Sequence, residues 1–408
     1  MGCFSDKKEK IPLTAKRLGE FAVLLLSAAV IGVLCGAVGG AFAKSIGFVT
    51  ALRAEYPWLI YILPFGGLVS VALYKLARVE SIGTDRVLES VRGEEETPVL
   101  LAPVVFAASV ITHLFGGSAG KEGAALQIGS GVAELVSRIT KADSKRRSVL
   151  TVCGMAALFS AVFGTPVAAC IFAAEVAILG RIDVVAALPA LVSSVAAHMI
   201  SLCLDVEHES FHLDSMPAFG AVLLIKIIAV AAIAALVSVV FCCAIRRGKK
   251  LFENLFGNAY VRIFAGGCLI VVLTLILGTD YNGGGMFVVE RIFEEGVARP
   301  EAFLLKILFT VITVSAGYKG GEVVPSFFIG ATLAAVLSPV FGLPAEFGAA
   351  IGMVAFFSGV TNCPVASSVI GIELFGADGI LFFALAAFTA RAFSGKVSLY
   401  RQAEKTLV

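Results

Sequence analysis

Two glutamates, Glu122 and Glu322, lie in glycine-rich breaks within otherwise apolar sequence. Glu122 stands in GGSAGKEGAALQIG, and Glu322 stands in SAGYKGGEVVPSFFIG. A break that starts a new helix leaves backbone N–H groups free at the helix N-terminus, where the helix dipole attracts an anion. An ionised glutamate at such a point can fill the anion site with its own carboxylate, and it vacates the site when protonated. One residue can therefore couple the passage of an anion to the passage of a proton.

Each glutamate also has a structural interpretation. Glu122 can simply cap its helix, since glutamate is favoured in a first turn. An acidic side chain inside a membrane costs about 2.5–3.5 kcal/mol on insertion scales, which favours a functional role. Glu322 can be a cap satisfied by Gly320 and Gly321, or a second protonatable group that selects the anion or carries the proton inward. Two carboxylates at one anion site repel each other unless one is protonated.

An internal repeat places these breaks in equivalent halves of the chain. Residues 155–175 and 353–373 align without a gap at an offset of 198, and nine of the 21 positions are identical. Paired hydrophobic segments interrupted by Gly and Pro point to an inverted-repeat transporter whose ion site lies where the broken helices meet. Glu175 and Glu373 occupy equivalent positions of the two copies, so we expect them in buried hydrogen bonds or helix caps.

Composition identifies the surroundings as a membrane. The chain is 58% hydrophobic and 15% charged, with a mean hydropathy of +0.95, far from a soluble domain. Several apolar stretches are shorter than the ~20 residues that cross the hydrocarbon core, which predicts partial helices packed inside protein. We expect a cytoplasmic segment at 1–18, repeat halves at 19–215 and 216–401, and a short cytoplasmic tail at 402–408 with no soluble regulatory domain.

Basic residues cluster in a few places, and the positive-inside rule puts these loops and both termini in the cytoplasm. The clusters are Lys7, Lys8, Lys10, Lys16 and Arg17; Lys75 and Arg78; Lys141, Lys145, Arg146 and Arg147; Arg246, Arg247, Lys249 and Lys250; and Arg401 and Lys405. No cluster is interleaved with aromatic residues on a soluble element, so no nucleic-acid partner is predicted. The nine cysteines lack metal-ligand spacing, and we expect no metal and no cofactor.

One pattern belongs to a different class of protein. Gly116, Ser118 and Gly120 form G-x-S-x-G, the nucleophile elbow of hydrolases, which requires a strand–turn–helix context and a partner histidine. Here the flanks are apolar helix, and His198 is the candidate base in a membrane segment. His208 and His212 share the polar stretch EHESFH, which favours an exposed loop. An intramembrane hydrolase is thus a remote alternative.

Several motifs together resemble the CLC chloride channels and transporters. GKEGxxxQIG at 120–129 resembles the GREGP motif of that family, and GGEVVP at 320–325 resembles GGxFxP. SIGTDRV at 81–87 falls where the family has GSGIPxV, and GKVSLY at 395–400 falls where it has GKPLY. The resemblance runs in order from about residue 19 to 401. It implies an all-α polytopic membrane protein of many tilted and broken helices in two inverted halves, a homodimer with one anion pathway per subunit.

Departures from the chloride pattern refine the expected function. Ile82 stands where the family has its chloride-binding serine, and Ala124 replaces the proline of GREGP. Glu322 occupies a normally apolar position, followed by Val323 in place of phenylalanine. Val176 stands where antiporters of the family often place an inner proton-carrying glutamate. Loss of the serine together with gain of a glutamate resembles the fluoride/proton antiporter branch of the family.

The resemblance therefore implies export of fluoride driven by inward proton flow, with no enzymatic activity, in a prokaryotic plasma membrane. Glu122 and Glu322 are the expected groups for gating and proton transfer. A chloride/proton antiporter and a passive anion channel are the alternatives within the same fold. Tyr400 is expected to present its hydroxyl to the anion, and an interfacial aromatic anchor is its alternative role. The full set of expected anion-binding residues is Ile82, Gly83, Glu122, Gly123, Glu322, Val323, Val324 and Tyr400.

Overall fold

The computed structural model describes residues 7–79, 83–91, 96–177, 184–211, 213 and 216–400, and for residues 7–18 and 184 it describes the backbone only. Across these ranges the protein forms sixteen α-helices and two 3-10 helices, with no strand. Ile82, His212, Arg401, Lys405 and the tail at 402–408 lie outside the described residues. The expected all-α class is confirmed.

The helices fall into two series of eight that follow the internal repeat. The first series is α1 (Lys7–Glu55), α2 (Leu63–Leu76), α3 (Thr84–Val91), α4 (Leu101–Leu114), α5 (Glu122–Ile139), α6 (Ser144–Phe163), α7 (Pro166–Ala177) and α8 (Val184–Cys203). The second series is α9 (Ala221–Leu255), α10 (Ala259–Leu277), α11 (Met286–Glu295), α12 (Ala302–Ala316), α13 (Val323–Phe341), α14 (Ala345–Thr361), α15 (Pro364–Phe375) and α16 (Ile380–Ser394). The 3-10 helices are η1 (Pro57–Ile62) and η2 (Ala377–Gly379).

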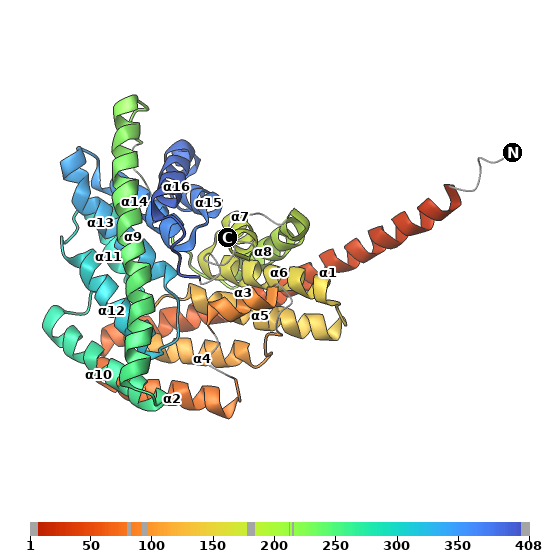
Figure 1. Ribbon diagram of the computed structural model, residues 1–408, viewed down its shortest axis with the longest axis horizontal. Coiled ribbons are helices and arrows are strands. Elements are labelled where there is room, and N and C mark those ends of the chain that lie inside the picture. The colour runs from red at the N-terminus through yellow and green to blue at the C-terminus, as the bar shows by residue number, and fades with distance from the viewer. Residues whose placement is uncertain are drawn as a thin grey trace.

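The two repeat copies coincide with α6–α7 and α14–α15. In Figure 1, α9 lies beside α13 and α14, whereas α3 lies beside α5 and α6. The expected boundary between residues 215 and 216 falls in the segment between α8 and α9, and the division into domains stays a prediction.

The outer helices of the bundle present apolar side chains, as a membrane protein requires. In the described part of the chain, eight helices are long and apolar enough to cross a membrane. Phe48, Phe65, Ile225 and Ile276 are exposed on α1, α2, α9 and α10, whereas the apolar windows of α6 and α13 are 78% buried. The protein is therefore an integral membrane protein, with α6 and α13 packed in its interior.

Glycine pairs bring the inner helices into backbone contact. A Cβ atom on Gly154 of α6 would lie 2.2 Å from the carbonyl oxygen of Gly129 on α5. In the second half, a Cβ atom on Gly352 of α14 would lie 2.2 Å from the carbonyl oxygen of Gly330 on α13. Helices in lipid associate through such close approach of small residues. The same contact thus recurs at equivalent positions of both halves.

Helices α7 and α15 are joined by reciprocal caps between the halves. The Glu175 carboxylate of α7 accepts hydrogen bonds from the backbone N–H groups of Val365 (3.3 Å) and Ala366 (2.8 Å), at the start of α15. The Glu373 carboxylate of α15 accepts them from Val167 (3.0 Å) and Ala168 (2.8 Å), at the start of α7.

Both helices begin at a proline, whose missing N–H costs nothing in a first turn. The expected capping role of the two glutamates is therefore seen directly.

Several basic clusters expected in loops lie on helices. Residues 246–250 form part of the 35-residue helix α9, which continues to Leu255, and residues 145–147 lie in the first turn of α6. Arginine and lysine are good helix formers, and their long side chains reach solvent from a helix that extends past the apolar stretch. Likewise, α1 begins at Lys7, within the polar segment that precedes the apolar sequence.

We predict that Gly154→Ala destabilises the protein, because its methyl group would overlap the Gly129 carbonyl. The free energy of unfolding should fall by about 1–3 kcal/mol, the usual cost of overpacking. Thermal unfolding of the purified protein in detergent measures the change. Gly47→Ala is the control, since no atom lies within 4 Å of its added Cβ. Equal melting temperatures for the two variants would contradict the backbone contact.

Candidate functional site

The two glycine-rich breaks meet at the centre of the protein. Gly120 and Gly321 form an isolated antiparallel bridge, in which each N–H donates to the carbonyl of the other at 2.7 and 2.6 Å. Only glycine fits at Gly321, because a Cβ atom there would lie 2.4 Å from the Gly123 nitrogen. The bridge therefore brings the N-termini of α5 and α13 together, as the repeat predicted.

The Glu122 side chain crosses from the first half to the second. Its carboxylate is fully buried, and Oε2 accepts a hydrogen bond of 3.1 Å from the backbone N–H of Val324 in the first turn of α13. Oε1 accepts one of 3.0 Å from the N–H of Lys121. The carboxylate thus stands where the free N–H groups and dipole of α13 would hold an anion.

Two cavities reach this junction. The Lys121 cavity, of about 740 Å³, is lined by Gly120, Lys121 and Val324, together with residues of α1 and the segment before α11. The Tyr400 cavity, of about 340 Å³, is lined by residues that include Gly320, Glu322 and Tyr400. Gly120, within the bridge, lines the first cavity, and Gly320, next to the bridge, lines the second. The Glu122 carboxylate packs against Gly120 and Gly321 of the same bridge.

Most residues expected at the site are gathered here. Gly83, Glu322 and Tyr400 line the Tyr400 cavity, while Val324 lines the Lys121 cavity. Val323 is buried, and a Cβ atom built on Gly123 would come within 3.0 Å of the Gly320 carbonyl. Tyr400 is 6% exposed, a burial that does not suit an interfacial anchor.

Glu322 does not cap the helix that it precedes. It occupies the N-cap position of α13, yet its side chain makes no capping hydrogen bond. Its Oε1 instead lies 3.8 Å from the Lys249 ammonium, and the side chain is 20% exposed. Glu322 therefore faces the Tyr400 cavity as an accessible carboxyl group. Val176 is buried and apolar, so no acid stands at its position.

A buried lysine beside the Lys121 cavity escaped the sequence analysis. Lys306 of α12 is fully buried, and its ammonium donates hydrogen bonds to the carbonyls of Tyr281 (3.1 Å) and Gly283 (2.7 Å). It also lies 5.1 Å from the ring centroid of Phe328. It thereby holds the segment that forms one wall of the cavity, at Asn282, Gly284 and Gly285. The sequence does contain a signal for this residue, because a lysine inside the apolar stretch 301–317 indicates a buried charge with a role.

The hydrolase pattern does not assemble a nucleophile. Ser118 is fully buried, and its hydroxyl is 3.0 Å from that of Thr310. The His198 ring lies 5.4 Å from the His208 ring, whose Nε2 is 3.1 Å from the Ala161 carbonyl. None of the interactions described for Ser118 involves a histidine.

Two inverted helical halves that meet at a buried carboxylate are typical of ion-transport proteins, and the candidate site lies where the halves meet. A family model described as "Voltage gated chloride channel" matches residues 65–395, and the chain belongs to this CLC family. The chain is 31% identical to the "Chloride/fluoride channel protein" of Pseudomonas syringae pv. tomato, over 94% of this chain and 86% of that protein. It is 26% identical to the "H(+)/Cl(-) exchange transporter ClcA" of Salmonella arizonae, over 86% of this chain and 80% of that protein.

Solved structures share the fold. A crystal structure of a CLC-type fluoride/proton antiporter superposes with a TM-score of 0.91 at 34% identity, covering 94% of this chain and 98% of that one. A slow cyanobacterial Cl⁻/H⁺ antiporter superposes with a TM-score of 0.77 at 20% identity, covering 91% and 94%. The expected CLC-type inverted repeat is thereby confirmed.

We predict that Lys306→Met lowers the free energy of unfolding by about 1–3 kcal/mol, because the Tyr281 and Gly283 carbonyls lose a buried donor. Removal of the buried charge offsets part of this loss. The melting temperature in detergent measures the effect, with Lys44→Met as the control at an exposed position of the same cavity. An unchanged melting temperature for Lys306→Met would show that the two hydrogen bonds contribute nothing net.

Proposed function

We propose that the protein is a fluoride/proton antiporter that exports fluoride across a prokaryotic plasma membrane, driven by inward proton flow. Glu122 is its proton-coupled gate. The observation that carries this proposal is the hydrogen bond from the Val324 N–H to the buried Glu122 carboxylate. Ionised, the carboxylate competes with an anion for the start of α13. Protonated, it loses most of its attraction to the helix dipole and leaves the N–H free for fluoride.

The orientation in the membrane is proposed from the basic cluster on α9. The positive-inside rule favours the cytoplasm for the cluster at residues 246–250, and Lys249 of this cluster lines the Tyr400 cavity. In our proposal this cavity faces the cytoplasm, as do both chain termini. Fluoride enters from there, passes the α13 N-terminus, and leaves by the Lys121 cavity while Glu122 carries protons the other way.

The preference for fluoride is supported by the chemistry of the site and by the relatives. Glu322 stands in the Tyr400 cavity with Tyr400, so a protonated Glu322 offers an O–H donor to a small, strongly accepting anion. Fluoride is also the basic halide, able to share a proton with a carboxyl group. The 34% identity with a fluoride/proton antiporter over most of both chains supports the same choice.

A chloride/proton exchanger is the second candidate. The similarity to an H(+)/Cl(-) exchange transporter favours it. A passive channel would have the same fold, and one relative is described as a channel protein. We propose further that the halves 19–215 and 216–401 form one anion pathway per subunit and that two subunits form a homodimer in the lipid bilayer.

The first test compares fluoride with chloride. Liposomes that contain the purified protein are loaded with either anion, and efflux is followed together with the pH of the medium. We expect fluoride efflux to exceed chloride efflux clearly and to move protons against their gradient. Equal efflux of the two anions would refute the fluoride preference, and anion flux without proton movement would identify a channel.

The second test removes the charge of the gate. Glutamine matches glutamate in size but cannot ionise, so Glu122→Gln should abolish proton movement driven by a fluoride gradient, down to the level of protein-free liposomes. Glu207→Gln is the control, because Glu207 lines the Lys121 cavity and is exposed. If Glu122→Gln still moved protons and fluoride in the wild-type ratio, Glu122 would not be the gate.

A further inference from the structure

A threonine lines the Tyr400 cavity next to α5, the helix that begins at Glu122. Thr84 is the first residue of α3 and is half-buried. Its Oγ1 is 3.5 Å from Nε2 of Gln127, which is on α5. A Cβ atom built on Gly123 would lie 3.6 Å from the same oxygen. The Thr84 hydroxyl therefore lies against the start of α5, one residue beyond Glu122.

Thr84 and Gln127 together retain an unused donor. Gln127 is 5% exposed and lines the Tyr400 cavity, yet its buried Oε1 has no hydrogen-bond partner among the described residues. If Nε2 donates to Thr84, the threonine hydrogen remains available. If the amide is turned over, Thr84 donates to Oε1 and both Nε2 hydrogens remain. Either arrangement leaves an O–H or N–H group for a third partner.

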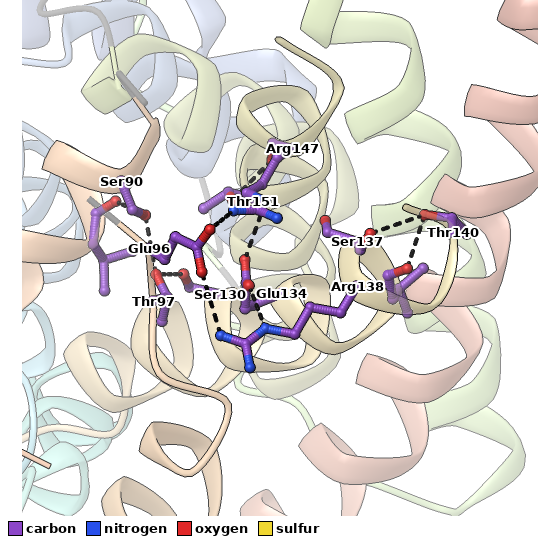
Figure 2. A network of polar contacts seen from close by, with 12 residues as sticks. Ser90, Glu96, Thr97, Ser130, Glu134, Ser137, Arg138, Thr140, Arg147 and Thr151 are labelled. Carbon is purple, nitrogen blue, oxygen red and sulfur yellow. Dashed lines mark hydrogen bonds and ion pairs between the residues drawn. The ribbon is translucent and has the colours of Figure 1, made fainter. Parts of the chain in front are cut away.

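Helix α3 is held on α5 at its other end as well (Figure 2). The Thr97 hydroxyl lies 3.0 Å from that of Ser90 on α3 and 3.0 Å from that of Ser130 on α5. Just beside them, Glu96 forms ion pairs with Arg138 and Arg147.

The hydrogen bond and charge of Arg147 lower the pKa of this exposed Glu96 carboxyl, which keeps the ion pairs formed near neutral pH. Because α3 is anchored at both ends, the Thr84 hydroxyl is held in place before any anion arrives.

The formal charges around the Tyr400 cavity cancel. Its ionisable residues, tyrosine aside, are three basic and three acidic, namely Lys249, Arg262, Lys319, Asp85, Glu253 and Glu322. Fluoride and chloride carry the same charge, so the charge of the cavity does not distinguish them in any case. Selection between the two anions therefore depends on short-range hydrogen-bond donors. Fluoride is a smaller and stronger acceptor than chloride and binds an O–H donor more tightly.

We propose that the Thr84 hydroxyl, supported by Gln127, is a fluoride ligand on the Tyr400 side of the Glu122 gate. It supplies the hydroxyl donor that the chain lacks at Ile82, from a position two residues further along. This inference rests on the proposed fluoride transport. It makes Thr84 a specificity-determining residue and Gln127 the positioning residue behind it.

The experiment compares Thr84→Val, which keeps the shape but removes the hydroxyl, with Thr84→Ser, which keeps the hydroxyl. Initial fluoride efflux from liposomes is measured against internal fluoride concentration, and chloride efflux is measured in parallel. Loss of one hydrogen bond to a charged group predicts a rise of roughly ten- to a hundredfold in the half-saturating fluoride concentration for the valine variant. Its fluoride-to-chloride rate ratio should fall. Serine should restore wild-type values, and Thr84→Ala gives the same loss as valine if valine does not fold.

The outcomes separate the two proposals. If the wild type moves no fluoride, the proposed function fails and this inference fails with it. If the wild type moves fluoride and the valine or alanine variant matches it in half-saturation and rate ratio, only the role of Thr84 is refuted. Equal impairment of the serine and valine variants also refutes it, because packing and not the hydroxyl would then matter.

Discussion

Backbone N–H groups at the starts of helices are the constraint on which this structure depends. The bilayer core offers no water to satisfy them, so each buried helix start needs a partner within the protein. Three glutamates supply that partner, and each reaches from one half of the repeat into the other. Glu122 binds α13, Glu175 binds α15 and Glu373 binds α7. Capping of helix starts therefore also holds the two halves together.

The same chemistry serves two purposes because the surroundings differ. Glu175 and Glu373 each accept two backbone N–H bonds from one helix, and neither lines either of the cavities at the junction. Glu122 accepts a single bond from the opposite half, and the two residues that donate to it, Lys121 and Val324, line the Lys121 cavity. A cap with one such bond beside a cavity is more open to competition from an anion than a cap with two. The proposed transport cycle thus uses one member of a set of caps whose other members are structural.

The proposed gate needs rigid surroundings. Gly129 with Gly154, and Gly330 with Gly352, fix α5 against α6 and α13 against α14 at backbone distance. Lys306 ties the wall of the Lys121 cavity to α12, and the anchored α3 forms part of the Tyr400 cavity. In the proposed cycle, protonation of the Glu122 carboxyl then changes the occupancy of the α13 N-terminus without rearranging the helices around it.

By itself, the sequence determined the features that depend on local composition and on repetition. The glycine-rich breaks indicated Glu122 and Glu322 as candidate site residues, and the 198-residue offset predicted the inverted repeat. Hydropathy identified the chain as a membrane protein. Only the tertiary structure decided which distant groups form hydrogen bonds. Glu175 caps a helix about 190 residues away, Lys306 donates to the backbone of a cavity wall, and Gln127 lies within hydrogen-bond distance of Thr84. The physical reason is that hydropathy and helix breaks are properties of neighbouring residues. A hydrogen bond between distant segments is set only when helix packing brings its donor and acceptor together.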